Sequence, residues 1–351
     1  PIFGAMSTWD VSRVTDMGGA FYSSSFYGST FNGDISSWDT SSVTNMFRTF
    51  YNARKFNQDI SSWDVSNVNN MSEMLNAAFD FNQYIGDWDT SSVTNMQRMF
   101  RWARSFDQDI NSKLVTRGDG STYNAWDVSN VEDMSYMFQG DSFLMISFNK
   151  DISDWDTSSV TNMESMFRYA SSFNQDVSSW DVGSVTNMNQ MFYAASSFNQ
   201  DVSPWDISSV TNMSLLFAET SFDKDISVWD MIGVNSTNGM FAGTPFNQDI
   251  GNWDMSNVNN INRMFNNTTE FNQDISSKLV TLTNGSTYTA WDVSNVEDMS
   301  YVFDGVSDFN QDISNWDTAS VTSIKSMFAH SSYNPDIKTK VVRGLILLIK
   351  I

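Results

Sequence analysis

A repeat of 24–25 residues runs through this 351-residue chain and restricts its fold more than any other feature. Each repeat contains one Trp-Asp pair, and the twelve tryptophans are Trp9, Trp38, Trp63, Trp88, Trp126, Trp155, Trp180, Trp205, Trp229, Trp253, Trp291 and Trp316. Successive spacings are 24 or 25 residues, or 29 or 38 residues where a segment is inserted. A fixed period in this range is typical of a solenoid, in which each repeat forms one coil stacked on the next. A propeller of Trp-Asp repeats would need about 40–45 residues per blade.

The pattern inside one repeat predicts the coil. In residues 60–78, apolar residues at i, i+3 and i+5 match the L-x-x-L-x-L pattern of a leucine-rich repeat. This predicts a short strand over 62–66, with Trp63 and Val65 directed inward and Asp64 outward. Apolar residues at helical spacing predict a short helix or 3₁₀ turn over 71–78. The expected fold class is an α/β solenoid, a right-handed leucine-rich-repeat superhelix of about 12 coils forming one domain over residues 1–351.

Two longer inserts interrupt the repeat at related places. The segment Lys113–Phe138 recurs 165 residues later as Lys278–Phe303, and each copy adds 13 residues ahead of its tryptophan. Each insert has two short runs around a Gly-containing turn, which predicts hairpins near 113–125 and 278–290. The apolar end of the chain, 337–351, is expected to form an irregular cap. Its run Gly344–Ile351 is far shorter than the ~20 apolar residues of a membrane-spanning helix, so no membrane span is predicted.

The charge of the chain limits its partners. Nineteen basic and 41 acidic residues give a formal net charge of 19 − 41 = −22. This acidity argues against nucleic acids and anionic membrane surfaces, whose phosphates would be repelled. It leaves cations and basic proteins as partners. The 40% of hydrophobic residues is enough to build a core, so the chain is not a polar coil.

The sequence does not favour an enzyme. The absence of cysteine excludes a disulfide, a thiolate metal site and a thiol nucleophile, and His330 is the one histidine. There is no G-x-S-x-G elbow and no Gly-rich phosphate loop. Carboxylates are abundant, but every coil offers the same groups, whereas an active site needs one asymmetric pocket. We predict no catalytic residues.

The unit WDVSNVTNM-x-x-MF-x-x-A-x-x-FNQDIS resembles that of the BspA-like leucine-rich-repeat surface proteins. The same repeat is known as a mycoplasma lipoprotein domain of unknown function. The resemblance extends from Trp9 to about Ile337, with local departures in residues 229–241 and in the last coil. It implies an extracellular or cell-surface protein that adheres to or binds other proteins and has no enzymatic site.

Two sets of aspartates recur once per coil and account for 23 of the 41 acidic residues. We name the first set, which follows the repeated tryptophans, the Trp-Asp row: Asp10, Asp39, Asp64, Asp89, Asp127, Asp156, Asp181, Asp206, Asp230, Asp254, Asp292 and Asp317. We name the second set the turn row: Asp34, Asp59, Asp109, Asp151, Asp176, Asp201, Asp225, Asp249, Asp274, Asp312 and Asp336. Like charges one strand apart repel by roughly 1 kcal/mol per pair in water, so something must offset them.

The turn row has two interpretations. Each carboxylate could accept backbone N–H groups in an Asx turn or at a helix cap. Alternatively, Ca²⁺ could bind carboxylate oxygens, with Asp59, Asp109, Asp151, Asp176 and Asp201 as candidate ligands. No loop matches an EF-hand or a Gly-rich Ca²⁺-binding repeat. Calcium is the one cofactor considered, and no other is expected.

The Trp-Asp row is the candidate binding face. Its neighbours on the predicted open face are small, mostly serine, so a basic or cationic partner could reach the carboxylates. We therefore predict that the members from Asp39 to Asp317 contact partner proteins, including basic or extracellular-matrix proteins. The alternative is a solvated face that only keeps the protein soluble.

Asparagine and two hairpin tips supply further candidates. The asparagines after the repeated phenylalanines are expected to form an internal ladder to loop backbone, with glycan binding as the alternative: Asn32, Asn57, Asn82, Asn149, Asn174, Asn199, Asn247, Asn272, Asn310 and Asn334. Arg117-Gly118-Asp119 at the first hairpin tip could act as an integrin-type adhesion tripeptide. Asn284 at the second tip is the most accessible of six N-x-Ser/Thr sequons for glycosylation.

The sequence thus predicts a surface-exposed, non-enzymatic adhesion or interaction module. The alternative is a structural subunit or spacer of an extracellular filament or matrix, joined end to end through exposed terminal coils. The apolar segment 340–351 favours such self-association, because a soluble monomer should have a polar cap there.

Overall fold

The structure of this chain, a computed structural model, describes residues 6–333. The chain divides into two compact units, Pro1–Gln200 and Asp201–Ile351, and each is described by itself. The predicted cap over 337–351 lies outside the described residues, as do Asp336 of the turn row and Asn334 of the asparagine ladder.

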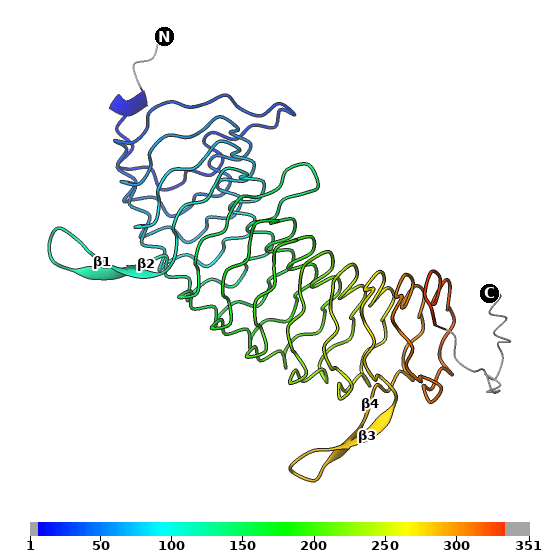
Figure 1. The fold of residues 1–351 in the computed structure, drawn as a ribbon. Helices are drawn as coiled ribbons and strands as arrows, with labels where there is room; N and C mark the ends of the chain where they lie inside the picture. Colours follow the sequence, from blue (N-terminus) through cyan, green and yellow to red (C-terminus); the bar gives the residue numbers. More distant parts are fainter. Residues whose placement is uncertain (1–5, 334–351) are drawn as a thin grey trace. The chain divides into compact units, whose positions relative to one another are not determined.

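Regular secondary structure is sparse in residues 6–333. It comprises the 3₁₀ helix η1 (Met6–Thr8) and the strands β1 (Lys113–Thr116), β2 (Thr122–Ala125), β3 (Lys278–Thr281) and β4 (Thr287–Ala290). Strands β1 and β2 pair antiparallel, with Lys113 opposite Ala125, and β3 and β4 pair in the same register. The two sequence inserts are therefore β-hairpins, and each projects from its unit (Figure 1).

Consecutive repeats stack as coils through single-residue parallel bridges. In the first unit the bridges join Asp16, Asn45, Asn70, Asn95, Asp133, Asn162 and Asn187 in order. In the second unit they join Asn212, Ser236, Asn260, Asp298 and Ser323. Each bridging residue lies seven positions after a repeated tryptophan. We call these residues the bridge column.

The strand predicted over 62–66 was wrong: residues 61–62 and 66–67 are turns, and Asn70 is the one bridging residue of the coil. The short helix or 3₁₀ turn predicted over 71–78 is a run of turns at the expected place. Residues 72–77 are turns because Glu73 and Ala77 have φ of 56° and 58° and so interrupt a right-handed helix. Backbone N–H groups there alternate between the neighbouring coil and the residue three positions back, as in Glu73 N to Gln97 O (2.8 Å) and Met74 N to Met71 O (3.1 Å).

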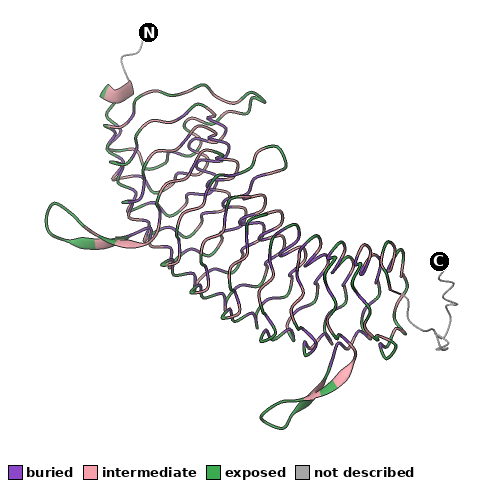
Figure 2. Ribbon diagram, in the orientation of Figure 1, coloured by how far each residue is buried: buried purple, intermediate pink, exposed green. Residues whose placement is uncertain are grey.

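Side chains of the same kind pack in columns inside each unit. The repeated tryptophans from Trp38 to Trp316 are at most 7% exposed, whereas Trp9 is 48% exposed. Trp126, Trp155 and Trp180 stack with ring centroids 6.2 Å apart. Two columns of phenylalanine lie beside them, as in Phe138 and Phe148, whose centroids are 4.2 Å apart. Buried residues recur at the same places in successive coils (purple in Figure 2).

The buried indoles also satisfy backbone groups. The Nε1–H of Trp155 donates to the carbonyl of Ile110 in the preceding coil (2.9 Å), and that of Trp253 donates to Ile226 (3.3 Å). Trp63 and Val65 are 3% and 1% exposed, as the inward pattern predicts. The aspartate after each tryptophan is therefore carried to the outside of its coil.

Candidate functional site

The Trp-Asp row consists of aspartates held in one geometry. In each coil one carboxylate oxygen, Oδ1, accepts the backbone N–H two residues further on. The Asp39 carboxylate, for example, accepts Ser41 N at 3.1 Å and the Ser41 hydroxyl at 2.6 Å. Each Asx turn begins at the aspartate that follows the repeated tryptophan, and it fixes the direction of that carboxylate.

Most of this row is open to solvent. Asp39, Asp64, Asp156, Asp181, Asp206, Asp230 and Asp317 are exposed, whereas Asp89, Asp127, Asp254 and Asp292 are half-buried. The half-buried members lie in the coils that flank the two hairpins. Tyr123 of β2 donates its hydroxyl to the carbonyl of Asp87, and Tyr288 of β4 donates to that of Asn252, so each hairpin rests on the preceding coil.

Hydrogen bonds within the turns favour the charged form of Asp39 and Asp206. The Ser41 hydroxyl, then the Ser41 backbone N–H, lower the pKa of Asp39, while burial and the like charge of Asp10 act weakly in the opposite direction. The Ser208 hydroxyl and N–H lower the pKa of Asp206 in the same way. At these two aspartates the turn thus offsets repulsion from neighbouring carboxylates.

The turn row uses the same Asx turn. Asp59 accepts Ser61 N at 2.9 Å, and Asp151 and Asp176 accept Ser153 N and Ser178 N at 2.9 Å. Backbone hydrogen bonding is therefore an adequate explanation of this row. Over residues 6–333, no three His, Cys, Asp or Glu side chains converge as metal ligands would. Calcium binding by Asp59, Asp109, Asp151, Asp176 and Asp201 stays a prediction.

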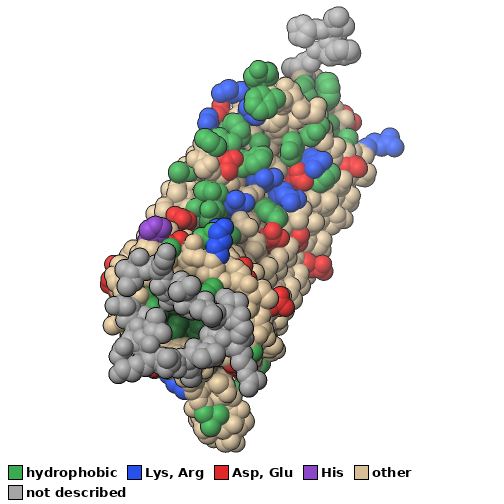
Figure 3. Space-filling model, turned by 90° about the vertical axis from the view of Figure 1, so that its right-hand side faces the viewer, with side chains coloured by type: hydrophobic (Ala, Val, Ile, Leu, Met, Phe, Trp, Pro, Cys, Tyr) green, Lys and Arg blue, Asp and Glu red, His purple; other side chains and the backbone are tan. Residues whose placement is uncertain are grey.

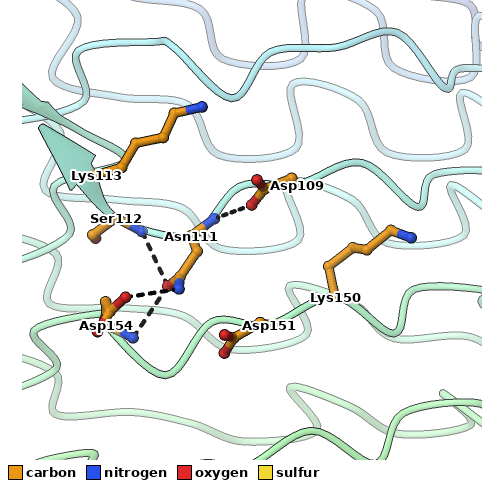
Figure 4. Close-up of a pocket in the computed structure, with 7 residues that line it drawn as sticks. All are labelled: Asp109, Asn111, Ser112, Lys113, Lys150, Asp151 and Asp154. Carbon is orange, nitrogen blue, oxygen red and sulfur yellow. Dashed lines mark hydrogen bonds between the residues drawn. The ribbon is translucent and has the colours of Figure 1, made fainter. Parts of the chain in front are cut away.

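A polar pocket of about 520 Å³ brings two of the calcium candidates, Asp109 and Asp151, to one place (Figure 4). Lys113 and Lys150 line the same pocket. Asn111 crosses it, accepting the N–H of Asp154 at 3.1 Å and donating to the Asp154 carboxylate at 2.9 Å. Both ammonium groups are paired with aspartates other than these two, that of Lys113 with Asp87 at 2.9 Å and that of Lys150 with Asp107 at 3.0 Å. Asp201 lines a separate pocket of about 460 Å³ in the second unit, again with a lysine, Lys224.

The bridge column was not identified from the sequence as a third Asx column. Asn70 accepts Ser72 N at 3.0 Å, and Asp133 accepts Ser135 N at 2.8 Å. Ser236 accepts Asn238 N at 3.5 Å. Asparagine and aspartate therefore serve equally at this place in the coil, and serine makes a longer contact. The signal in the sequence is the short polar residue seven positions after each tryptophan.

The asparagine ladder lies on another edge of the coils. Asn57 Oδ1 accepts Asn82 N from the next coil and also the Gln83 side-chain amide, both at 2.9 Å. Asn82, Asn149 and Asn174 accept the corresponding N–H of the next coil, and Asn247 and Asn272 do so in the second unit. These side chains have a structural role, which the ladder interpretation predicts.

The adhesion tripeptide is engaged within the first unit. Arg117 forms an ion pair with Asp89 of the Trp-Asp row, and its guanidinium lies 4.1 Å from the Tyr123 ring centroid. Asp119 accepts the N–H and hydroxyl of Ser121 at 2.9 and 2.7 Å. Asn284 at the other tip is exposed and accepts the N–H of Ser286 at 2.9 Å.

Comparison with known proteins identifies the family. Stacked coils of this period, with recurring carboxylates on the outside of each unit, define a repeat protein. Residues 2–114, 113–221, 200–284 and 278–344 match the family described as Mycoplasma protein of unknown function, DUF285, and the chain belongs to that family.

No curated protein and no solved structure matches the chain. A search of residues 6–333 finds no helix with the length and apolar character needed to cross a bilayer.

Proposed function

We propose that this chain is a right-handed solenoid of leucine-rich-repeat type, related to the BspA-like surface proteins, and that it works outside the cell or on its surface. Its role is non-enzymatic adhesion or protein–protein interaction, in which the Trp-Asp row receives a basic partner protein. The stacking of coils within each unit and the carboxylates held outward in one geometry support this proposal.

One comparison within the chain carries the proposal. The bridge column shows that an Asx-type turn in this coil is made by asparagine, aspartate or serine. Even the turn row has Tyr84 in the place of one aspartate. The Trp-Asp row nevertheless has aspartate in all twelve repeats. Because the turn alone does not need the charge, the charge at this row has a further use, which we assign to a basic partner.

The geometry of the row suits such a partner. Coils stack at about the strand spacing of 4.7–4.9 Å, so each unit presents carboxylates at short and regular intervals. A row of one charge sign raises the local concentration of an oppositely charged protein and speeds its association. The turns fix each carboxylate before binding, so little side-chain freedom is lost on contact.

Two triple variants of equal charge test the proposal. The first, Asp64→Asn, Asp156→Asn and Asp181→Asn, removes three exposed charges of the Trp-Asp row but keeps the acceptor oxygen of each turn. The control, Asp59→Asn, Asp151→Asn and Asp176→Asn, removes three exposed charges of the turn row. Binding of a fluorescein-labelled oligolysine peptide is followed by fluorescence anisotropy. At roughly 0.2–1 kcal/mol per exposed ion pair, the first variant should bind about 3- to 150-fold more weakly.

The control should bind the peptide nearly as the unmodified chain does. Equal weakening of both variants would mean that only net charge matters, and the Trp-Asp row would then be a solvated face. Melting temperatures of both variants should stay close to that of the unmodified chain, because asparagine makes the same turn in the bridge column.

A further inference from the structure

A second surface of the first unit has the opposite character from the acidic rows. In the six coils that carry Trp38 to Trp180, the residues 13 positions after the tryptophan form a set that we call the arginine lane: Tyr51, Asn76, Arg101, Gln139, Arg168 and Tyr193. Backbone bonds from the residue after each one place them in consecutive coils, as in Ala77 N to Arg101 O (2.8 Å) and Trp102 N to Gln139 O (2.9 Å). Figure 3 shows a face of the molecule on which Lys and Arg side chains lie among hydrophobic and acidic ones.

Two arginines in this lane lack an ion-pair partner among the described residues. Arg101 and Arg168 are half-buried, and neither forms an ion pair with a carboxylate of residues 6–333. Nearby Arg48, by contrast, is paired with Glu73 at 3.0 Å. Burial, and next the charge of Arg98, lower the pKa of Arg101, while Tyr51, Glu73 and Tyr136 act in the opposite direction with smaller effect. A half-buried cation beside another cation is unfavourable until an anion approaches it.

Buried amides between these cations also lack partners. Asn76 is 1% exposed, and neither its Oδ1 nor its Nδ2 is hydrogen-bonded. Gln139, 5% exposed, has an unpaired Oε1, and the Nε atoms of Arg101 and Arg168 are unpaired too. Native proteins leave few buried polar atoms unpaired, so a cluster of them in one lane calls for an explanation.

Aromatic rings line the same lane. The Arg101 guanidinium lies 3.8 Å from the Trp102 ring centroid, and that of Arg168 lies 5.3 Å from Tyr169 and 5.4 Å from Tyr193. Trp102 is the one tryptophan outside the repeat. Arginine, tyrosine and tryptophan are the residues most enriched where protein partners bind tightly.

We propose that the arginine lane binds an acidic segment of a partner polypeptide. Carboxylates of that segment pair with the guanidinium forks of Arg101 and Arg168, which suit bidentate contact. The aromatic rings supply the apolar contact area.

The second unit provides an internal comparison. Its residues at the corresponding positions are Ala218, Ala242, Asn266, Asp304 and Ala329. Asn266 there donates to the carbonyl of Asp304 at 3.2 Å, so its side chain is used within the unit. These positions carry small side chains, an asparagine and an aspartate but no basic group that could pair with an acidic segment. The proposed site therefore belongs to the first unit alone.

The test uses the full chain and a fluorescein-labelled oligoglutamate peptide at about 0.15 M salt, where charges more distant than ~8 Å are largely screened. The variant Arg101→Ala with Arg168→Ala should bind the peptide at least about 10-fold more weakly. The control Arg263→Ala removes an arginine that lies over an aromatic ring, Tyr301, in the second unit, and should bind as the unmodified chain does. Hydrogen exchange should show protection over residues 97–104 and 164–170 when peptide is bound.

Lysine at both positions keeps the charge but loses the planar fork, so Arg101→Lys with Arg168→Lys should bind the peptide with intermediate affinity. This variant also keeps the test valid if the alanine variant misfolds. Three results would overturn the proposal: equal binding by the unmodified chain and the alanine variant, protection elsewhere in the chain, or binding of a sulfated oligosaccharide but not of the peptide. Because the Trp-Asp row is tested with a basic peptide, failure of one proposal leaves the other standing.

Discussion

At the scale of the residue, one arrangement recurs: a short polar side chain accepts the backbone N–H two positions on. It closes turns in the Trp-Asp row, the turn row and the bridge column, as at Asp39, Asp59 and Asn70. The composition of the chain indicates many such turns but not which of them also serve binding. That distinction comes from a comparison of the columns: asparagine often takes the place of aspartate in the bridge column and never does so in the Trp-Asp row.

The aspartate turns make stability dependent on pH. Hydrogen bonds hold the pKa of Asp34, Asp39 and Asp206 below the ordinary value, so folding favours their charged form. This stabilisation is present above the unfolded pKa of about 3.9 and is lost as pH falls through the folded values. We expect the melting temperature to fall as the pH drops below about 4.

A double variant, Asp39→Asn with Asp206→Asn, isolates this effect. Its amide oxygens still accept the turn N–H, but the side chains no longer titrate, so its melting temperature should fall less over the same interval. Identical curves for the variant and the unmodified chain would show that these two carboxylates do not contribute to acid sensitivity.

At the scale of the element, each coil depends on polar side chains that bond to its neighbour. Asn57 shows this, since its Oδ1 serves both Asn82 N and the Gln83 amide. Asn57→Ala should lower the free energy of unfolding by about 1–3 kcal/mol, because it leaves a partly buried N–H unpaired. Denaturant unfolding measures the loss.

The matched control is Asn69→Ala, which removes an exposed asparagine side chain from the same coil. Its effect should be within about 0.5 kcal/mol. If the two variants lose equal stability, the hydrogen bonds of Asn57 do not contribute measurably to the free energy of unfolding.

The sequence predicted some of this element and missed the rest for identifiable reasons. The insert beginning at Lys113 carries alternating runs around a Gly-containing turn, so a hairpin is readable from it. The apolar spacing at 71–78 predicts a short helix or 3₁₀ turn, and turns form there instead of a helix because Glu73 has a φ of 56°. The sequence does not reveal this φ, since glutamate seldom adopts a positive value. The arginine lane was missed because its members are 25–38 residues apart and differ in type, although their constant distance from each tryptophan is present in the sequence.

At the scale of the whole molecule, stability rests on columns of aromatic side chains rather than on helices or sheets. Trp155 is 3% exposed and stacks between Trp126 and Trp180. Trp155→Ala should cost about 3–5 kcal/mol, because it opens a cavity in the column and removes the bond to Ile110. In repeat proteins the effect passes mainly to nearest neighbours, so hydrogen exchange should rise most in residues 126–185.

Trp102→Ala is the control, since this half-buried indole lies outside the column and its Nε1 has no hydrogen-bond partner. It should cost clearly less than Trp155→Ala. A larger loss from Trp102→Ala would mean that the indole column does not dominate the stability of the first unit.

The bridge column has one more implication. Asn45, Asn70 and Asn95 make the same backbone contact to the coil on either side, so the stacking contact is the same between successive coils. Duplicating or deleting a complete 25-residue block would preserve the backbone bridges between coils and would change the length of a unit by about 4.8 Å. Duplication of part of the gene could thus lengthen a unit one coil at a time, without any change to the existing residues of the Trp-Asp row.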